Sequence, residues 1–167
     1  MIPIYLINHH TATARDTTTF ASIKAGHIRR GWHNIGYHFF IDGKGNLYGY
    51  PQARGQDQVG AHAKKPMNQM SLGICLAGNF EIEQPSKEQL NTLKNLIFEL
   101  QAQWNIPNEN ILGHGEVKGA KTLCPGKNFM PFIIGLREKN DCKNCEKLRK
   151  ELKVANNKLI KIKEIVK

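Results

Sequence analysis

The chain has no long apolar run, few acidic residues and few cysteines. No apolar stretch approaches the roughly 20 residues that a membrane-spanning helix needs, so we expect no membrane span. The four cysteines do not suggest a disulfide-stapled scaffold, because 167 residues are enough to bury a core without one. Residues 1–5 lack the charged segment and the small-residue cleavage site of a secretory signal peptide, so we expect a protein made in the cytoplasm.

The charge is strongly one-sided. The chain has 24 Lys and Arg against 14 Asp and Glu, which gives a formal net charge of +10. Such a charge favours an anionic partner, whether nucleic acid, a membrane surface or an acidic cell-wall polymer. Residues 138–167 hold half of the excess, with ten basic and five acidic side chains. Nucleic acid is the least supported partner, because no nucleic-acid-binding motif is present and no aromatic residue lies in the basic tail.

Hydrophobic periodicity and turn residues predict an α/β fold in which a central mixed β-sheet is flanked by helices. The turn at 43–46 joins two of the expected strands into a hairpin. Ser86 and Gln89 form a capping box that opens a helix, and Asp16 is a candidate N-cap for the first helix. The expected strands are 3–8, 37–42, 47–50, 71–77 and the short segment 111–114, and the expected helices are 17–30, 86–104 and 129–136.

Residues 140–167 differ in kind from the rest of the chain. Their apolar positions step by three and four residues, which is the a/d pattern of a coiled coil over about three heptads. We therefore expect two parts, a domain over 1–137 and an added basic, heptad-patterned C-terminal helix over 138–167. This helix either self-associates, giving a homo-oligomer, or folds back on its own domain. The pattern consists of Cys145, Leu148, Leu152, Ala155, Leu159, Ile162 and Val166.

Three side chains from distant segments offer a metal site with nitrogen and sulfur ligands. His9 ends an apolar strand, His114 follows a short extended segment, and Cys124 lies in the sequence Thr-Leu-Cys-Pro-Gly. Two imidazoles and one thiolate, with a fourth position left to water, are typical of catalytic zinc, whereas structural zinc has four protein ligands. His10 competes with His9, but neighbouring side chains on a strand point to opposite faces and cannot readily serve one metal.

The other three cysteines give weaker signals. Cys75 lies in an apolar run and is expected to be an inert buried residue. Cys142 and Cys145 form a single CxxC, which lacks the second pair that a structural zinc site needs.

Four stretches, taken in order, make the chain resemble a known family. They are His-His-Thr-Ala-Thr from His9, Gly-Tyr-His-Phe around Tyr37, Gly-Ala-His-Ala around His62, and Gly-His at 113–114 with the segment around Cys124. Together they span about residues 1–136. They resemble the zinc-dependent N-acetylmuramoyl-L-alanine amidases, which include phage lysozyme-type amidases and catalytic peptidoglycan-recognition proteins. The resemblance implies a mixed sheet flanked by helices, one Zn²⁺ per chain in a surface groove, and peptidoglycan as the partner.

The resemblance also implies roles for individual residues. It assigns His9, the first histidine of the pair, as a metal ligand together with His114 and Cys124. It makes Tyr37 a catalytic residue whose phenol hydrogen-bonds the attacking water or the oxyanion. Thr122 takes a catalytic position that holds lysine in the phage enzymes and threonine in the peptidoglycan-recognition amidases. Its hydroxyl can donate to an oxyanion but is not a practical base near pH 7.

Substrate contacts are implied for the segment between the two halves of the metal site. His62 would bond the stem peptide, and Asn68 would shape the loop that binds it. Arg54 would meet a peptide carboxylate with two parallel hydrogen bonds, and Trp32 would line the sugar side. The alternative for each is an ordinary polar loop residue. The general base stays open, because Glu116 lies nearby but no family motif marks it.

These signals predict zinc-dependent hydrolysis of the amide bond between the lactyl group of N-acetylmuramic acid and L-alanine of the stem peptide. The compact size and the absence of a signal peptide favour a phage or prophage endolysin that a separate factor releases to the cell wall. The alternative is a non-catalytic peptidoglycan-binding protein. Such homologues lack a complete metal triad, so the presence of Cys124 favours the enzyme.

Overall fold

The structure, a computed structural model, describes residues 1–138. The expected heptad-patterned helix, its self-association and the pair of Cys142 and Cys145 lie outside the described residues. The division of the chain at residue 137 therefore stays a prediction. Within residues 1–138, every helix is too short or too polar to cross a bilayer.

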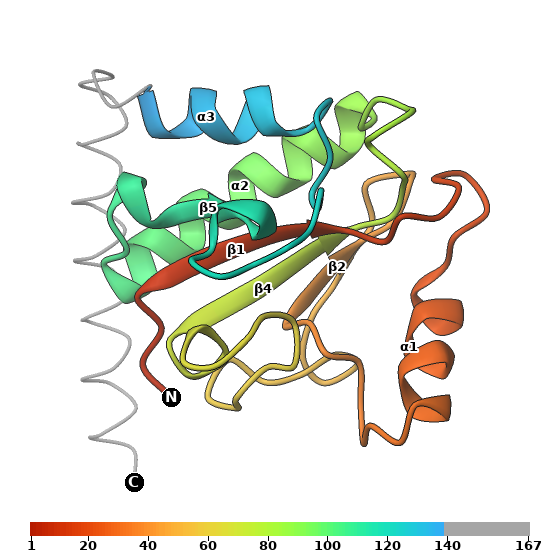
Figure 1. Cartoon of the computed structure of the whole chain (residues 1–167), viewed down its shortest axis with the longest axis horizontal. Helices are drawn as coiled ribbons and strands as arrows, with labels where there is room; N and C mark the ends of the chain where they lie inside the picture. The colour runs from red at the N-terminus through yellow and green to blue at the C-terminus, as the bar shows by residue number, and fades with distance from the viewer. Residues whose placement is uncertain (139–167) are drawn as a thin grey trace, which may run out of the picture.

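A five-stranded sheet forms the centre of the fold, in the order β3-β2-β4-β1-β5 (Figure 1). Four strands run parallel, and β3 pairs antiparallel with β2 as the second strand of the expected hairpin. This mixed sheet and its flanking helices confirm the fold class predicted from the sequence. The strands are β1 (Tyr5–His10), β2 (Phe39–Ile41), β3 (Leu47–Tyr48), β4 (Ser71–Leu76) and β5 (Ile111–Gly113).

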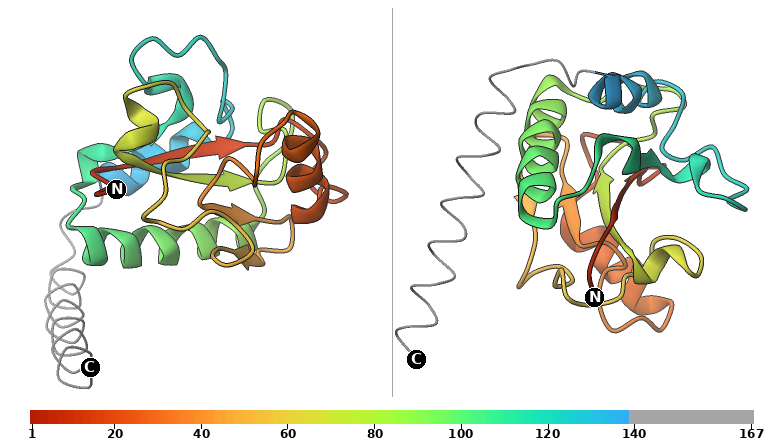
Figure 2. Two further views of the ribbon diagram at one scale, coloured as in Figure 1. Left: turned by 90° about the horizontal axis from the view of Figure 1, so that it is seen from below. Right: turned by 90° about the vertical axis from the view of Figure 1, so that its left-hand side faces the viewer.

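Helices cover both faces of the sheet. Apolar side chains of α2 and α3 bury against Leu6 and Ile74 on one face. α1 packs on the other face, where Phe20 meets Phe40, and Figure 2 shows from two further sides that α1 stands apart from α2 and α3. The helices are α1 (Phe20–Arg29), α2 (Lys87–Trp104) and α3 (Met130–Glu138), with 3₁₀ turns η1 (Met67–Gln69), η2 (Asn108–Asn110) and η3 (His114–Glu116).

The start of α1 differs from the sequence-based expectation, whereas α2 begins at the predicted capping box. The N-cap of α1 is Thr19, not Asp16. The Thr19 hydroxyl accepts a hydrogen bond from the Ser22 backbone N–H (3.1 Å), and the Ser22 hydroxyl accepts one from the Thr19 N–H (3.2 Å). The Asp16 carboxylate instead pairs with Arg15 at 2.8 Å. The reciprocal pair satisfies two N-terminal donors, so the helix begins three residues later than predicted.

The alternation of β1 decides which of its side chains can reach a common site. Successive side chains of a strand point to opposite faces. Leu6 belongs to the core under α2 and α3, so His10 lies on that face and His9 lies on the other. His9 is in register with Cys75 of β4, whose side chain belongs to the core on the α1 face.

Candidate metal centre

The parallel strands β1 and β5 bring two histidines together at their carboxyl ends. Asn8 of β1 is in register with Gly113, the last residue of β5, so the next residue of each strand lies at the same edge. Those residues are His9 and His114, and their ring centroids are 4.5 Å apart. The carboxyl edge of a parallel sheet is where α/β proteins commonly hold ligands. The pairing register therefore places two candidate ligands side by side although they are distant in sequence.

Cys124 completes the cluster from the loop that follows η3. Its Sγ lies 3.7 Å from His9 Nδ1. The loop is fixed at this point because the Gly115 N–H donates to the Cys124 carbonyl (2.6 Å) and the Cys124 N–H donates to the Thr122 hydroxyl (3.1 Å). One ligand atom from each of His9, His114 and Cys124 lies within 4.8 Å of the others. Tetrahedral zinc with its usual bond lengths separates nitrogen and sulfur ligands by about 3.5 Å.

The protonation states of the cluster suit a cation. Burial lowers the pKa of His9 well below its ordinary value, with smaller contributions from His62 and His114. Burial also lowers the pKa of His114, so both imidazoles are held in the neutral form that binds metal. Burial raises the pKa of the Cys124 thiol to about 11, and a bound dication would reverse this by stabilising the thiolate. The donor set thus fits zinc, with two neutral nitrogens and one ionisable sulfur.

His10 lies apart from this cluster. Its Nδ1 accepts a hydrogen bond from the Phe80 backbone N–H at 3.0 Å, and its ring packs against the Phe80 ring with centroids 5.9 Å apart. His10 therefore satisfies a buried backbone donor under α2 and α3, on the face of the sheet opposite His9.

Tyr37 reaches the cluster from the segment that precedes β2. Its ring lies 5.2 Å from the His9 ring, measured between centroids. Burial raises the pKa of the Tyr37 phenol well above its ordinary value, and the neighbouring thiols of Cys75 and Cys124 act in the same direction. Cys75 is itself fully buried, as its apolar surroundings in the sequence predict. Tyr37 therefore stays a neutral phenol, which can donate a hydrogen bond.

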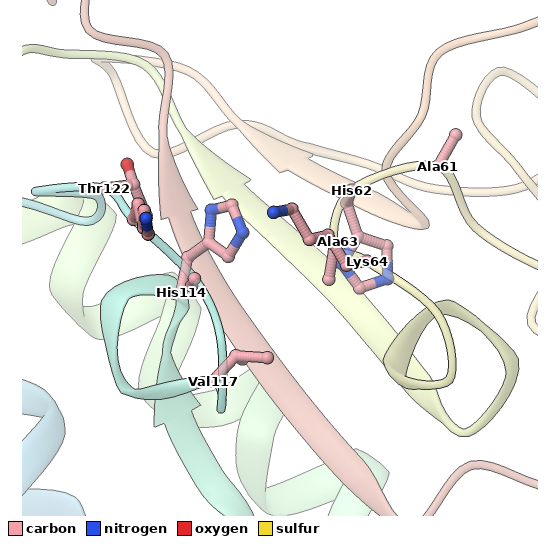
Figure 3. Close-up of a pocket in the computed structure, with 9 residues that line it drawn as sticks. Ala61, His62, Ala63, Lys64, His114, Val117 and Thr122 are labelled. Atoms are coloured by element: carbon pink, nitrogen blue, oxygen red, sulfur yellow. The ribbon is translucent and has the colours of Figure 1, made fainter.

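A cavity of about 320 Å³ adjoins the cluster. Figure 3 shows His114 and Thr122 on one side of it and His62 with Lys64 on the other. Lys121 also lines it, and none of its lining residues is acidic. The cavity therefore has a positive character and suits a substrate with carboxylate groups.

The residues expected to bind substrate fall into two groups. His62 lines the cavity, although only 7% of its surface is exposed. Arg54 and Trp32 do not line it: Arg54 donates to the carbonyls of Ile35 (3.3 Å) and Val59 (3.1 Å), and Trp32 packs on His27 with centroids 4.6 Å apart. The structure thus brings His62 to the site and holds Arg54 and Trp32 in its surroundings, where a contact with substrate stays a prediction.

Asn68 acts on the loop rather than on the cavity. Its Oδ1 accepts hydrogen bonds from the N–H groups of His62 (3.0 Å) and Ala63 (2.8 Å), and its Nδ2 donates to the Ala63 carbonyl. These bonds engage both ends of the carboxamide. Asn68 therefore holds His62 in place, which agrees with its expected loop-shaping role and leaves little of the side chain for substrate.

The sequence did not reveal the partner of His62. His62 Nδ1 lies 3.1 Å from His9 Nε2. Burial, with the neighbouring His38 as the next cause, lowers the pKa of His62 to about 3. Among the described residues its Nε2 has no partner in hydrogen-bond geometry, although the Ser71 carbonyl lies close enough to raise its pKa. No spacing pattern signals this contact, because it depends on how two loops pack.

Glu116 is committed to structure. Its carboxylate accepts a hydrogen bond from the Gly113 N–H at 2.8 Å and pairs with Arg137 of α3 at 2.7 Å. The side chain thereby ties the start of η3 to α3. This explains why Glu116 is a poor candidate for the general base.

Comparisons with known proteins agree with the fold and identify the family. A protein-family model described as N-acetylmuramoyl-L-alanine amidase matches residues 1–127. Peptidoglycan-recognition protein SC2 of Drosophila simulans is 36% identical over 133 residues, which are 75% of this chain and 69% of that protein.

Solved structures show the same likeness. The endolysin N-acetylmuramoyl-L-alanine amidase LysCS from Clostridium intestinale is 33% identical with a TM-score of 0.69, and the match covers 81% of this chain and 84% of that one. Drosophila PGRP-LB is 33% identical with a TM-score of 0.68, over 84% and 83% of the two chains. The family resemblance first drawn from four short motifs is thereby confirmed: the chain belongs to the N-acetylmuramoyl-L-alanine amidase family.

Proposed function

We propose that the chain is a zinc-dependent peptidoglycan amidase. It would hydrolyse the amide bond between the lactyl group of N-acetylmuramic acid and L-alanine of the stem peptide. The observation that carries this proposal is the meeting of His9, His114 and Cys124 within 4.8 Å beside an open cavity. When bound there, zinc lowers the pKa of water to about 7 and polarises the substrate carbonyl.

The protein's own residues then have distinct tasks. His9 and His114 would hold the cation as neutral imidazoles and Cys124 as a thiolate, which would leave the centre with a net charge of +1 and keep it electrophilic. Tyr37, a neutral phenol beside His9, donates a hydrogen bond to the oxygen on which negative charge develops. Thr122 lines the cavity, where its hydroxyl can donate a hydrogen bond to the substrate.

The charge of the cavity supports an acidic peptide as the substrate. Lys64 and Lys121 line it on an exposed surface, and a stem peptide carries free carboxylates. Attraction between them would raise the local concentration of substrate and orient its peptide end. The net charge of +10 acts in the same direction on the whole anionic wall.

An endolysin of a phage or prophage fits these features, and one of the similar solved structures is named as an endolysin. Such a protein would be made in the cytoplasm and would act on the cell wall after release. The alternative is a peptidoglycan-binding protein without activity, since the curated relatives are named as recognition proteins. The complete His, His and Cys set favours the enzyme, because a protein that only binds has no need of an ionisable ligand set beside the cavity.

The test measures bound metal and amide cleavage on the same preparations. Wild type, Cys124→Ser and an exposed-histidine control, His33→Ala, are assayed for zinc per chain and for new L-alanine amino groups released from purified peptidoglycan. The expected result is about one zinc per chain and cleavage by wild type and His33→Ala, with weaker zinc binding and no cleavage by Cys124→Ser. Zinc binding without cleavage would favour the binding protein. No zinc in wild type would remove the basis of the proposal.

A further inference from the structure

The two nitrogens of His9 face different partners. Nδ1 lies 3.7 Å from Cys124 Sγ, and Nε2 lies 3.1 Å from Nδ1 of His62. His9 is 1% exposed and His62 is 7% exposed, so the contact between the two rings is removed from solvent. Nδ1 is therefore the His9 nitrogen that is turned towards Cys124, whereas Nε2 is engaged by His62.

One arrangement of protons satisfies this geometry. A neutral imidazole has one N–H donor and one lone-pair acceptor. If Nδ1 of His9 gives its lone pair to a cation, its proton must sit on Nε2, which then donates to His62. Nδ1 of His62 must accept, so the proton of His62 sits on its own Nε2.

We propose that His62 is a positioning residue, which holds His9 in the Nε2-protonated tautomer with Nδ1 turned towards Cys124 and free to bind a metal. This inference rests on the proposed metal site and adds a residue that acts on it through His9. It also gives His62 a task different from the contact with the stem peptide that the sequence suggested.

The ring of His62 is locked in a narrow slot. A Cβ added to Gly60 would lie 2.5 Å from His62 Cδ2, and a Cβ added to Gly73 would collide with His62 Cγ. Any residue larger than glycine at either position would displace the ring. Asn68 fixes the backbone of His62 from a third side, through the bond to its N–H.

A second histidine supports the wall of the slot. His38 Nδ1 accepts a hydrogen bond from the Gly73 N–H (2.9 Å), and its Nε2 bonds the Gln58 carbonyl (2.9 Å). The His38 ring lies 5.5 Å from the His62 ring and meets it edge-on. His62 is thus held by the loop of 60–63, by β4 and by the segment before β2, which is the rigidity that an orienting residue needs.

The chemistry of the partner has a consequence for the charge of the centre. A ligating histidine usually donates its second N–H to a carboxylate, a backbone carbonyl or water. A carboxylate here would add a second negative charge beside the Cys124 thiolate and would bring the surroundings of a dication close to neutrality. A neutral imidazole orients His9 equally well and leaves the centre with its net positive charge.

Two substitutions at residue 62 separate orientation from mere packing. His62→Asn keeps an acceptor, because the carboxamide oxygen lies near the place of the imidazole Nδ1, whereas His62→Leu fills the slot without one. His33→Ala serves as the control for a histidine outside the site. Each full-length protein is titrated with zinc against a chelator, and the ¹⁵N shifts of the His9 ring are recorded in the metal-free form.

We expect His62→Leu to bind zinc about 10–100-fold more weakly than wild type, the usual effect of losing such a partner. His62→Asn and His33→Ala should stay within about threefold of wild type. Metal-free wild type and His62→Asn should show His9 protonated on Nε2, and His62→Leu should show a mixture of tautomers. Full-strength zinc binding by a folded His62→Leu would overturn the proposal.

The tautomer of wild type decides the matter even if His62→Leu fails to fold. His9 protonated on Nδ1 in the metal-free wild type would also overturn the inference. These readouts need no peptidoglycan. A failure of the proposed amidase activity can therefore be distinguished from a failure of the proposed role of His62. A wild type that binds zinc without cleaving the wall would contradict the activity and would leave the role of His62 intact.

Discussion

Zinc binding should release one proton from Cys124, and the structure sets the free-energy cost of that release. Burial raises the pKa of this thiol to about 11. A pH of 6.5 is therefore about 4.5 units below the pKa of the thiol. At about 1.4 kcal/mol per unit, ionisation costs roughly 6 kcal/mol. Structural zinc sites bind with roughly 10–16 kcal/mol, so the metal can offset this cost. His9 and His114 are mostly neutral at this pH and should add little to the release, because burial lowers the pKa of each below the ordinary 6.5.

The assay is calorimetric titration of zinc into the metal-free chain at pH 6.5, in two buffers with different ionisation enthalpies. The dependence of the heat on the buffer counts the protons released. Any proton lost by zinc-bound water is shared by wild type and Cys124→Ser, so the difference between the two should be one proton. At pH values below the pKa of the thiol, the zinc affinity of wild type should also fall about tenfold for each unit by which the pH is lowered.

Two outcomes would refute this reasoning. A difference near zero between wild type and Cys124→Ser would mean that the thiol is already ionised or does not bind the metal. A release of two or more protons by wild type, beyond the share from water, would mean that the histidines are charged in the metal-free protein.

Two further predictions concern acid and charge. Burial lowers the pKa of His38 to about 4 and of His62 to about 3, so their neutral forms stabilise the fold above pH 6.5 and this stability is lost as the pH falls. At pH 5 each histidine should lower the free energy of unfolding by about 2 kcal/mol relative to pH 8. Urea denaturation of the metal-free protein at the two pH values measures this difference, and equal stabilities would contradict the prediction. Exchanging both Lys64 and Lys121 for Gln should raise KM for peptidoglycan several-fold at low salt, with kcat nearly unchanged and the difference shrinking in about 0.5 M salt. An equal effect in a control that exchanges two exposed lysines outside the cavity, Lys65 and Lys118, would show that the cavity has no special role.

The parts of the fold that depend on local chemistry could be predicted from the sequence. The capping box of α2 and the hairpin of β2 and β3 follow from residues within a few positions of one another. The start of α1 could not be chosen in this way, because Asp16 and Thr19 are both good N-caps. The choice depends on Arg15, which takes the carboxylate, and on Ser22, which completes the reciprocal bond.

The candidate site likewise has a part that could be predicted from local sequence and a part that could not. Short sequence motifs identify His9, His114 and Cys124. The alternation of side chains along a strand then distinguishes His9 from His10. The bond between His9 and His62 could not be read, because it depends on the packing of Gly60 and Gly73 around one ring.

The candidate ligands His9 and Cys124 come from distant parts of the described chain. His9 and Cys124 are 115 residues apart in sequence, and their meeting requires β1, β5 and the loop after η3 to be in place together. An unfinished or unfolded chain thus lacks a preformed site, and the whole loop must close before the cation is captured. Metal uptake would then mark the completion of folding, and activity would arise late and all at once rather than gradually during synthesis. If the proposed endolysin role holds, such a delay would keep immature chains harmless to the cell that makes them.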